Sequence, residues 1–264
     1  MILALAITAS INFTPDVNAG QKAFRLEMCS GRPLVEYVYL NGHGPYRFLL
    51  DTGAQTNAVE SRVALDIGLK PTFRVEVATV AGVRLVPGGQ VNELRLGDIQ
   101  VSGLEFLAHS LDAIHALDPT IRGVLGQTLL SRFDYLIDVQ RRFLRFGEVP
   151  PRSGLRIDLE VDEGGRILLP TNLGRLALDS GTGTLILFDN PRGGGFEVRT
   201  LSGVTAASST APQRVEIAGY RLRSQPIITV ARPVGIYEAG LLPIIAFNAI
   251  YVSNSGKYVM VDPR

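Results

Sequence analysis

This chain carries the same eight-residue pattern in each of its two halves. Residues 47–54 read Arg-Phe-Leu-Leu-Asp-Thr-Gly-Ala, and residues 175–182 read Arg-Leu-Ala-Leu-Asp-Ser-Gly-Thr. Both run from a basic residue through three apolar residues to an aspartate, a hydroxyl residue, a glycine and a small residue. Asp51 and Asp179 stand 128 positions apart in a chain of 264 residues. A repeat of this length predicts two copies of one folding unit.

Further matches follow in the same order along both halves, which is hard to explain by chance similarity between strands. Residues 77–83, 91–97 and 123–126 are echoed by residues 198–204, 215–219 and 240–243. Each half then ends in two strand-like segments. The paired prolines in residues 148–154 suit an extended linker. We therefore predict an N-terminal segment at 1–29, an N-terminal lobe at 30–150 and a C-terminal lobe at 151–264.

The composition favours strands over helices. Apolar residues make up 46% of the chain, with 28 glycines and 15 prolines. The apolar runs span only four to eight residues, which is typical of strands bounded by turns. The predicted class is all-β with minor short helices at residues 61–67, 111–117 and 127–132. Residues 208–212 are expected to form a loop.

Charge and cysteine content exclude several functions. The chain has 26 basic and 25 acidic residues and no basic cluster, so we expect no nucleic-acid partner. Its single cysteine, Cys29, allows neither an intrachain disulfide nor a multi-cysteine zinc site. His109 and His115 are six positions apart, which does not place them on one helical face. We expect no metal and no cofactor, and we read Cys29 as a thiol without a catalytic role.

The N-terminus resembles a signal peptide. Residues 2–9 are apolar, and Val17-Asn18-Ala19 has the small residues of a cleavage site, although no basic residue precedes the apolar run. A signal peptide at 1–19 predicts a periplasmic or secreted protein, and a cytoplasmic one is the alternative. No apolar run reaches the ~18 residues needed to cross a bilayer, so no integral membrane segment is expected.

Each repeated aspartate ends a run of apolar residues. Phe48, Leu49 and Leu50 lead into Asp51, and residues 176–178 lead into Asp179 in the same way. A turn after a strand is the ordinary setting of Asp and Gly. Burial of a lone carboxylate, however, costs several kcal/mol or raises its pKa. Two such groups, one from each half, make physical sense if they meet.

The repeated pattern of two hydrophobic residues, Asp, Thr or Ser, and Gly resembles the aspartic proteases. The first copy is most similar to the retropepsin-like (peptidase A2) branch, through the turn at 41–45, the motif at 48–54 and the later element at 123–130. Residues 179–182 also resemble the C-terminal lobe of pepsin-like enzymes. The resemblance spans residues 34–262 and implies a bilobal fold with pseudo-twofold symmetry. It also implies that one chain carries both halves, so we expect a monomer rather than a dimer.

The resemblance implies an endopeptidase acting on a peptide or protein substrate. Asp51 and Asp179 would share one proton and activate a water molecule. Thr52 and Ser180 would clamp the two loops together by bonding the opposite backbone.

Three further loop residues have implied roles. Gly53 and Gly181 would leave room beside the carboxylates, and Thr182 would donate a hydrogen bond to Asp179.

A flap over the substrate is expected at Thr79, Val80, Ala81 and Gly82, with residues 201–203 as a lesser candidate.

One departure from the pattern leaves alternatives open. Pro243 stands where the second copy should carry the glycine that Gly126 provides in the first. The alternative reading is a weak or inactive aspartic-protease-fold protein that binds peptides, since a fold does not establish an activity. A glycosidase with paired carboxylates is a lower-ranked reading, because only the carboxylates favour it.

Overall fold

The computed structural model describes residues 23–79, 82–151, 153–190, 195–200, 203–223, 226–233 and 235–264. Strands dominate these residues and the helices are short, which confirms the predicted all-β class. No helix in the described part of the chain has the length and apolar character needed to span a membrane. The predicted signal peptide lies outside the described residues.

We call β1 to β10 the N-terminal half and β11 to β23 the C-terminal half. The N-terminal half consists of β1 (Ala23–Cys29), β2 (Arg32–Leu40), β3 (His43–Leu50), β4 (Asn57–Glu60), α1 (Ser61–Asp66), β5 (Phe73–Thr79), β6 (Gly82–Leu96), β7 (Ile99–His109), α2 (Asp112–His115), β8 (Ile121–Leu125), α3 (Gln127–Leu130), β9 (Tyr135–Asp138) and β10 (Phe143–Phe146).

The C-terminal half consists of β11 (Leu155–Asp158), β12 (Glu160–Val161), β13 (Ile167–Thr171), β14 (Gly174–Asp179), β15 (Leu185–Phe188), β16 (Gly195–Thr200), β17 (Gly203–Thr210), β18 (Glu216–Ile217), β19 (Tyr220–Arg221), β20 (Ile227–Val230), β21 (Gly240–Pro243), the 3₁₀ helix η1 (Ile244–Ala246), β22 (Phe247–Ser253) and β23 (Tyr258–Pro263).

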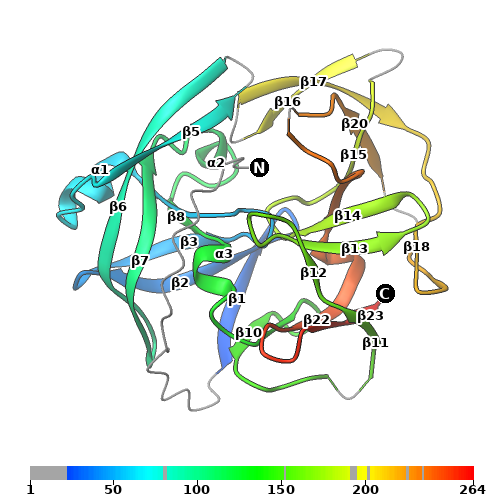
Figure 1. Ribbon diagram of the computed structural model, residues 1–264, viewed down its shortest axis with the longest axis horizontal. Helices are drawn as coiled ribbons and strands as arrows, with labels where there is room; N and C mark the ends of the chain where they lie inside the picture. Colours follow the sequence, from blue (N-terminus) through cyan, green and yellow to red (C-terminus); the bar gives the residue numbers. More distant parts are fainter. Residues whose placement is uncertain are drawn as a thin grey trace.

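The two halves repeat one strand arrangement. The N-terminal order is β2-β3-β8-β4-β7-β6-β5, and the C-terminal order is β13-β14-β21-β15-β20-β17-β16. The pairing directions repeat as well, since β3 runs parallel to β8 and β14 runs parallel to β21. Each half also contains an antiparallel hairpin, β5–β6 and β16–β17, and the labels of β5, β16 and β17 lie in the upper part of Figure 1.

A shared sheet joins the halves in the lower part of Figure 1. Its strand order is β11-β23-β22-β9-β10-β1, and it continues through β1 into β2. β22 pairs antiparallel with β9, with Ile250 opposite Ile137 and Val252 opposite Tyr135. All four of these residues are fully buried or nearly so. The segment between β10 and β11, where the sequence places the linker, leads from one half to the other.

The strands that end at the aspartates are buried on both faces. Phe48 and Leu50 pack in the main core, whereas Leu49 packs in a second cluster on the other side of the sheet. In β14 the residues Leu176 and Leu178 likewise face the main core, and Ala177 packs in a separate cluster. Burial on both faces explains why the three residues before each aspartate are continuously apolar instead of alternating.

Two local expectations differ from the structure. Ser208–Thr210 belong to β17 rather than to a loop, because β20 supplies backbone partners for these residues. The Thr210 hydroxyl also bonds the Thr229 hydroxyl on β20 at 2.6 Å, so the ladder accommodates a polar run. The C-terminal half contains the short helix η1 where the sequence shows no clear helix.

We expect Val252→Ala to lower the free energy of unfolding by about 2–3 kcal/mol, because it removes two methyl groups at the seam between the halves. Val161→Ala is the matched control, since Val161 is 48% exposed on β12 and Val252 is 0% exposed. The control should change stability by less than about 0.5 kcal/mol. Urea unfolding of both variants measures the difference, and equal stabilities would show that the seam is not a packed core.

Candidate active site

The loops after β3 and β14 bring Asp51 and Asp179 against each other. The backbone N–H of Asp51 donates to Leu125 O on β8 at 2.9 Å, and Asp179 lies opposite Pro243 on β21. A Cβ atom on Gly53 would come closer than 3.0 Å to the Asp179 carboxyl group. One on Gly181 would come equally close to the Asp51 carboxyl group. Each carboxyl group therefore fills the space left by the opposite glycine.

Four crossing hydrogen bonds hold the two loops together. The Thr52 hydroxyl donates to Leu178 O at 2.8 Å, and the Ser180 hydroxyl donates to Leu50 O at 2.6 Å. Thr52 Oγ1 in turn accepts a hydrogen bond from Ser180 N–H at 3.0 Å, and Ser180 Oγ accepts one from Thr52 N–H at 2.9 Å. Both side chains are 0% exposed. The hydroxyl groups of Thr52 and Ser180 thus tie the end of β3 to the end of β14 by bonding the opposite backbone.

Burial and mutual repulsion set the electrostatics of the pair. Asp51 is 2% exposed and Asp179 is 3% exposed. Desolvation, followed by the negative charge of Asp51, raises the pKa of Asp179 to about 7. Gly53 N–H donates to Asp51 Oδ1 at 2.9 Å, whereas Asp179 Oδ1 has no hydrogen-bond partner among the described residues. The pair therefore favours a state that holds one proton and one negative charge.

The Thr182 hydroxyl does not donate to Asp179. It donates instead to Thr184 O at 3.0 Å, and it accepts a hydrogen bond from Thr184 N–H. A local turn two residues away competes for the single hydroxyl proton and takes it. Thr182 lies in the loop after Asp179, but the hydrogen bond expected from the sequence is absent.

Pro243 stands in a setting that suits it. In the N-terminal half, the equivalent residue Gly126 donates its N–H to Asn57 Oδ1 at 2.9 Å. The register aligns Asn57 with Leu185 in the C-terminal half, and Leu185 is 1% exposed. An apolar Leu185 offers no acceptor, so the missing N–H of Pro243 leaves nothing unpaired. The C-terminal half thus replaces the hydrogen-bonded pair of Gly126 and Asn57 with the apolar pair of Pro243 and Leu185.

Two residues that the sequence does not single out contact the aspartate loops. Gln127 Nε2 donates to Thr52 O at 2.7 Å, and Arg32 Nε donates to Gly181 O at 2.8 Å. Gln127 begins α3 and follows directly after the Gly-Val-Leu-Gly segment at residues 123–126. Its place next to this segment is the sequence signal that could have identified it as a contact of the aspartate loop. Arg32 follows a two-residue turn and belongs to no motif.

The predicted flap lies only partly within the described residues. Thr79 ends β5 and pairs with Gly82, which begins β6, while Val80 and Ala81 fall outside the described part. The lesser candidate is similar, because Thr200 pairs with Gly203 and residues 201 and 202 fall outside it. Each candidate thus falls between the two strands of a hairpin, β5–β6 or β16–β17, at one edge of a sheet.

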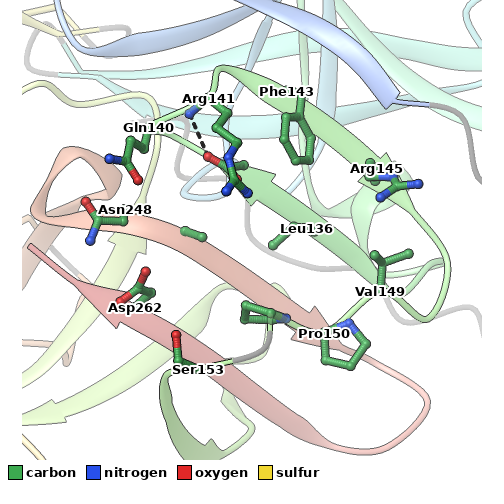
Figure 2. Close-up of a pocket in the computed structure, with 13 residues that line it drawn as sticks. Leu136, Gln140, Arg141, Phe143, Arg145, Val149, Pro150, Ser153, Asn248 and Asp262 are labelled. Atoms are coloured by element: carbon green, nitrogen blue, oxygen red, sulfur yellow. Dashed lines mark hydrogen bonds and ion pairs between the residues drawn. The ribbon is translucent and has the colours of Figure 1, made fainter.

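A cavity of about 490 Å³ lies on the sheet that joins the halves. Figure 2 shows Leu136 and Phe143 on the sheet and Val149 and Pro150 in the connecting segment around it. Its polar rim includes Asp138, which lies 3.5 Å from Arg141. None of the predicted site residues lines this cavity, so it is separate from the aspartate pair.

Comparisons with known proteins relate part of the chain to aspartic proteases. Residues 37–129 match the model of a family described as aspartyl protease. A retropepsin-like aspartic protease from Rickettsia conorii is 21% identical, with a TM-score of 0.38, over 51% of this chain and 95% of its own. No curated protein matches this chain. The family match thus relates residues 37–129, which lie in the N-terminal half, to aspartyl proteases.

We expect Thr52→Val to lower the free energy of unfolding by about 2–4 kcal/mol, because it leaves Leu178 O and Ser180 N–H buried without partners. Thr72→Val is the matched control, since Thr72 is exposed. Chemical unfolding of both variants, together with Ser180→Ala and the double variant, gives the coupling between the hydroxyls. Equal stability of the Thr52 and Thr72 variants would mean that the crossing bonds do not hold the loops.

The raised pKa of Asp179 predicts a stability that depends on pH. The folded protein binds this proton more tightly than the unfolded chain does, so the stabilisation is complete below about pH 4. It is lost as the pH rises through the folded pKa of about 7. Thermal unfolding between these limits should therefore show a decline in wild type. Asp179→Asn should lack that decline and should be the more stable protein at neutral pH; parallel curves would contradict the shift.

Proposed function

We propose that this chain is an aspartic endopeptidase that hydrolyses peptide bonds with a water molecule activated between Asp51 and Asp179. The observation that carries the proposal is the close approach of the two buried carboxyl groups, each seated against the opposite glycine. Both groups come from one chain, so a single molecule would hold a complete site. The family match over residues 37–129 supports the N-terminal half independently.

The chemistry follows from a pair that holds one proton. The ionised carboxylate accepts a proton from the bound water as that water attacks the scissile carbonyl carbon. The protonated carboxyl group donates a hydrogen bond to the carbonyl oxygen, where negative charge develops. The tetrahedral intermediate then collapses as a carboxyl group protonates the leaving nitrogen. The step needs no nucleophilic side chain, because water is the nucleophile.

The surrounding structure would keep this geometry rigid. The crossing bonds of Thr52 and Ser180 fix both loops, and Gln127 holds the backbone oxygen of Thr52. A preorganised pair loses little entropy when the substrate and water bind. The β5–β6 hairpin is the proposed flap, which would cover a peptide in an extended conformation and exclude solvent.

We expect Asp51→Asn and Asp179→Asn each to abolish turnover, because an amide cannot exchange the proton that the cycle requires. Wild-type activity should be bell-shaped in pH, and the base limb should lie near neutrality since the pKa of Asp179 is about 7. Digestion of a mixed peptide library at a series of pH values, read by mass spectrometry, measures both effects. Asp112→Asn is the matched control, since Asp112 is exposed on α2.

Two outcomes would separate this proposal from its alternatives. If Asp179→Asn kept substantial activity while Asp51→Asn lost it, the site would be formed by two N-terminal halves from two chains. If wild type bound peptides without cleaving them at any pH, the chain would be a peptide-binding protein with this fold. A peptide mimic with a central hydroxyl should inhibit, because it replaces the attacking water. Chelators and thiol reagents should leave activity unchanged.

A further inference from the structure

Arg32 reaches from the N-terminal half into the loop of Asp179. It follows a two-residue turn in which Ser30 has a φ of 48° and Gly31 a φ of 82°, and this turn reverses β1 into β2. The turn packs against the opposite loop, with the Cβ position of Gly31 3.5 Å from Gly183 Cα. The guanidinium group donates through Nε to Gly181 O at 2.8 Å and through Nη1 to Ser30 O at 3.1 Å.

The register identifies Arg166 as the counterpart of Arg32. Leu34 pairs with Leu49, two residues before Asp51, and Leu168 pairs with Ala177, two residues before Asp179. Two residues before Leu34 and Leu168 lie Arg32 and Arg166. The turns before them also correspond, since the turn at 162–166 packs on the other aspartate loop through Gly164 and the side chain of Gln55.

The two arginines differ in how their charge is balanced. Arg166 Nη2 lies 2.5 Å from Asp162 Oδ2, and Arg166 Nη1 lies 2.8 Å from Glu238 Oε1. The side chains of Arg166 and Glu238 are each 3% exposed, so the charge of Arg166 is neutralised within the fold. No carboxylate of the described residues lies within ion-pair distance of Arg32, which bonds only backbone oxygens there.

Arg32 instead faces the aspartate pair. Burial lowers the pKa of its guanidinium group, and the charges of Asp179, Cys29 and Asp51 act in the opposite direction. An arginine stays charged despite such a shift. Among the described residues, Arg32 on β2 is thus the cation that interacts with both aspartates, and Cys29 on β1 also acts on it. The turn at 162–166, which packs on the Asp51 loop, adds Asp162 and Arg166, and these two form an ion pair with each other. β8 and β21, which flank the two aspartate loops, bring only uncharged residues next to them.

We propose that Arg32 is a positioning residue that holds the Gly181 carbonyl group and, through its unbalanced charge, sets the pH range in which the Asp51–Asp179 pair holds one proton. This inference rests on the proposed function. A cation near the pair stabilises each successive negative charge on it, so it lowers the pH at which both protons leave. The structure supplies this cation from one half only, because Arg166 is neutralised.

The test is the pH profile of Arg32→Met. Loss of the charge should move both limbs of the activity profile upward by about half to one pH unit, because solvent at the partly exposed guanidinium group screens its charge well below the bare Coulomb interaction. Arg32→Gln is a second uncharged variant, in case the methionine variant folds poorly. Arg32→Lys should keep both limbs in place while lowering kcat, because the ammonium group retains the charge but lacks the planar fork.

Arg25→Met is the matched control, since Arg25 is exposed on β1 and its loss changes the net charge equally. Its profile should coincide with that of wild type. The proposal is overturned if Arg32→Met and Arg32→Gln lower the rate without moving either limb, which is the result of a purely structural role. It is also overturned if Arg25→Met or Arg32→Lys moves the limbs as far as Arg32→Met does.

A second readout separates this inference from the proposed function. The decline of thermal stability with pH, which reports the titration of Asp179, needs no substrate. Arg32→Met should carry the upper end of that decline to higher pH by the same half to one unit. If wild type cleaves no peptide, the proposed function fails, yet this shift still shows whether Arg32 acts on the pair. An unchanged decline would refute the charge role.

Discussion

The exchange of hydrogen bonds between Thr52 and Ser180 is the interaction on which the rest of this structure depends. Two carboxyl groups that lie close together repel each other once both are charged, and burial makes each charge costly. Groups other than the carboxyl groups must therefore hold the two loops together. The two hydroxyls do this with four buried bonds. Because each bond crosses between halves, each aspartate loop depends on the other half for these contacts.

The shared sheet that joins the halves provides the second constraint. β9 and β22 pair across the seam, with β10 and β1 of the N-terminal half on one side of it and β23 and β11 of the C-terminal half on the other. The loops and the seam together fix each half at two well-separated places. A rigid relation between halves is what a paired-carboxylate site requires, since small shifts at the loops would change the proton affinity of the pair. The cavity described above lies beside this seam and is lined by β9, β10, β22 and the segment that connects the halves.

The sequence predicts what depends on local pattern. Apolar runs that end in Asp51 and Asp179, together with the ordered repeat, were enough to anticipate an all-β fold with two similar halves. Contacts that depend on tertiary placement were not predictable. The bond from Arg32 to Gly181 spans 149 residues and follows no motif. The sequence predicts a bond from Thr182 to Asp179, because the competing turn to Thr184 depends on the folded backbone and leaves no sequence signal.

Pro243 shows why covalent connection of the halves matters. In a symmetric assembly of two identical chains, every substitution appears twice, so a proline at this position would also remove the N–H that Asn57 requires. In a single chain the exchange occurs once, and Leu185 accommodates it. Each half can then accumulate its own compensated changes, as the different surroundings of Arg32 and Arg166 also show. Because the two halves are joined in one chain, the surroundings of Asp51 and of Asp179 can change independently of each other.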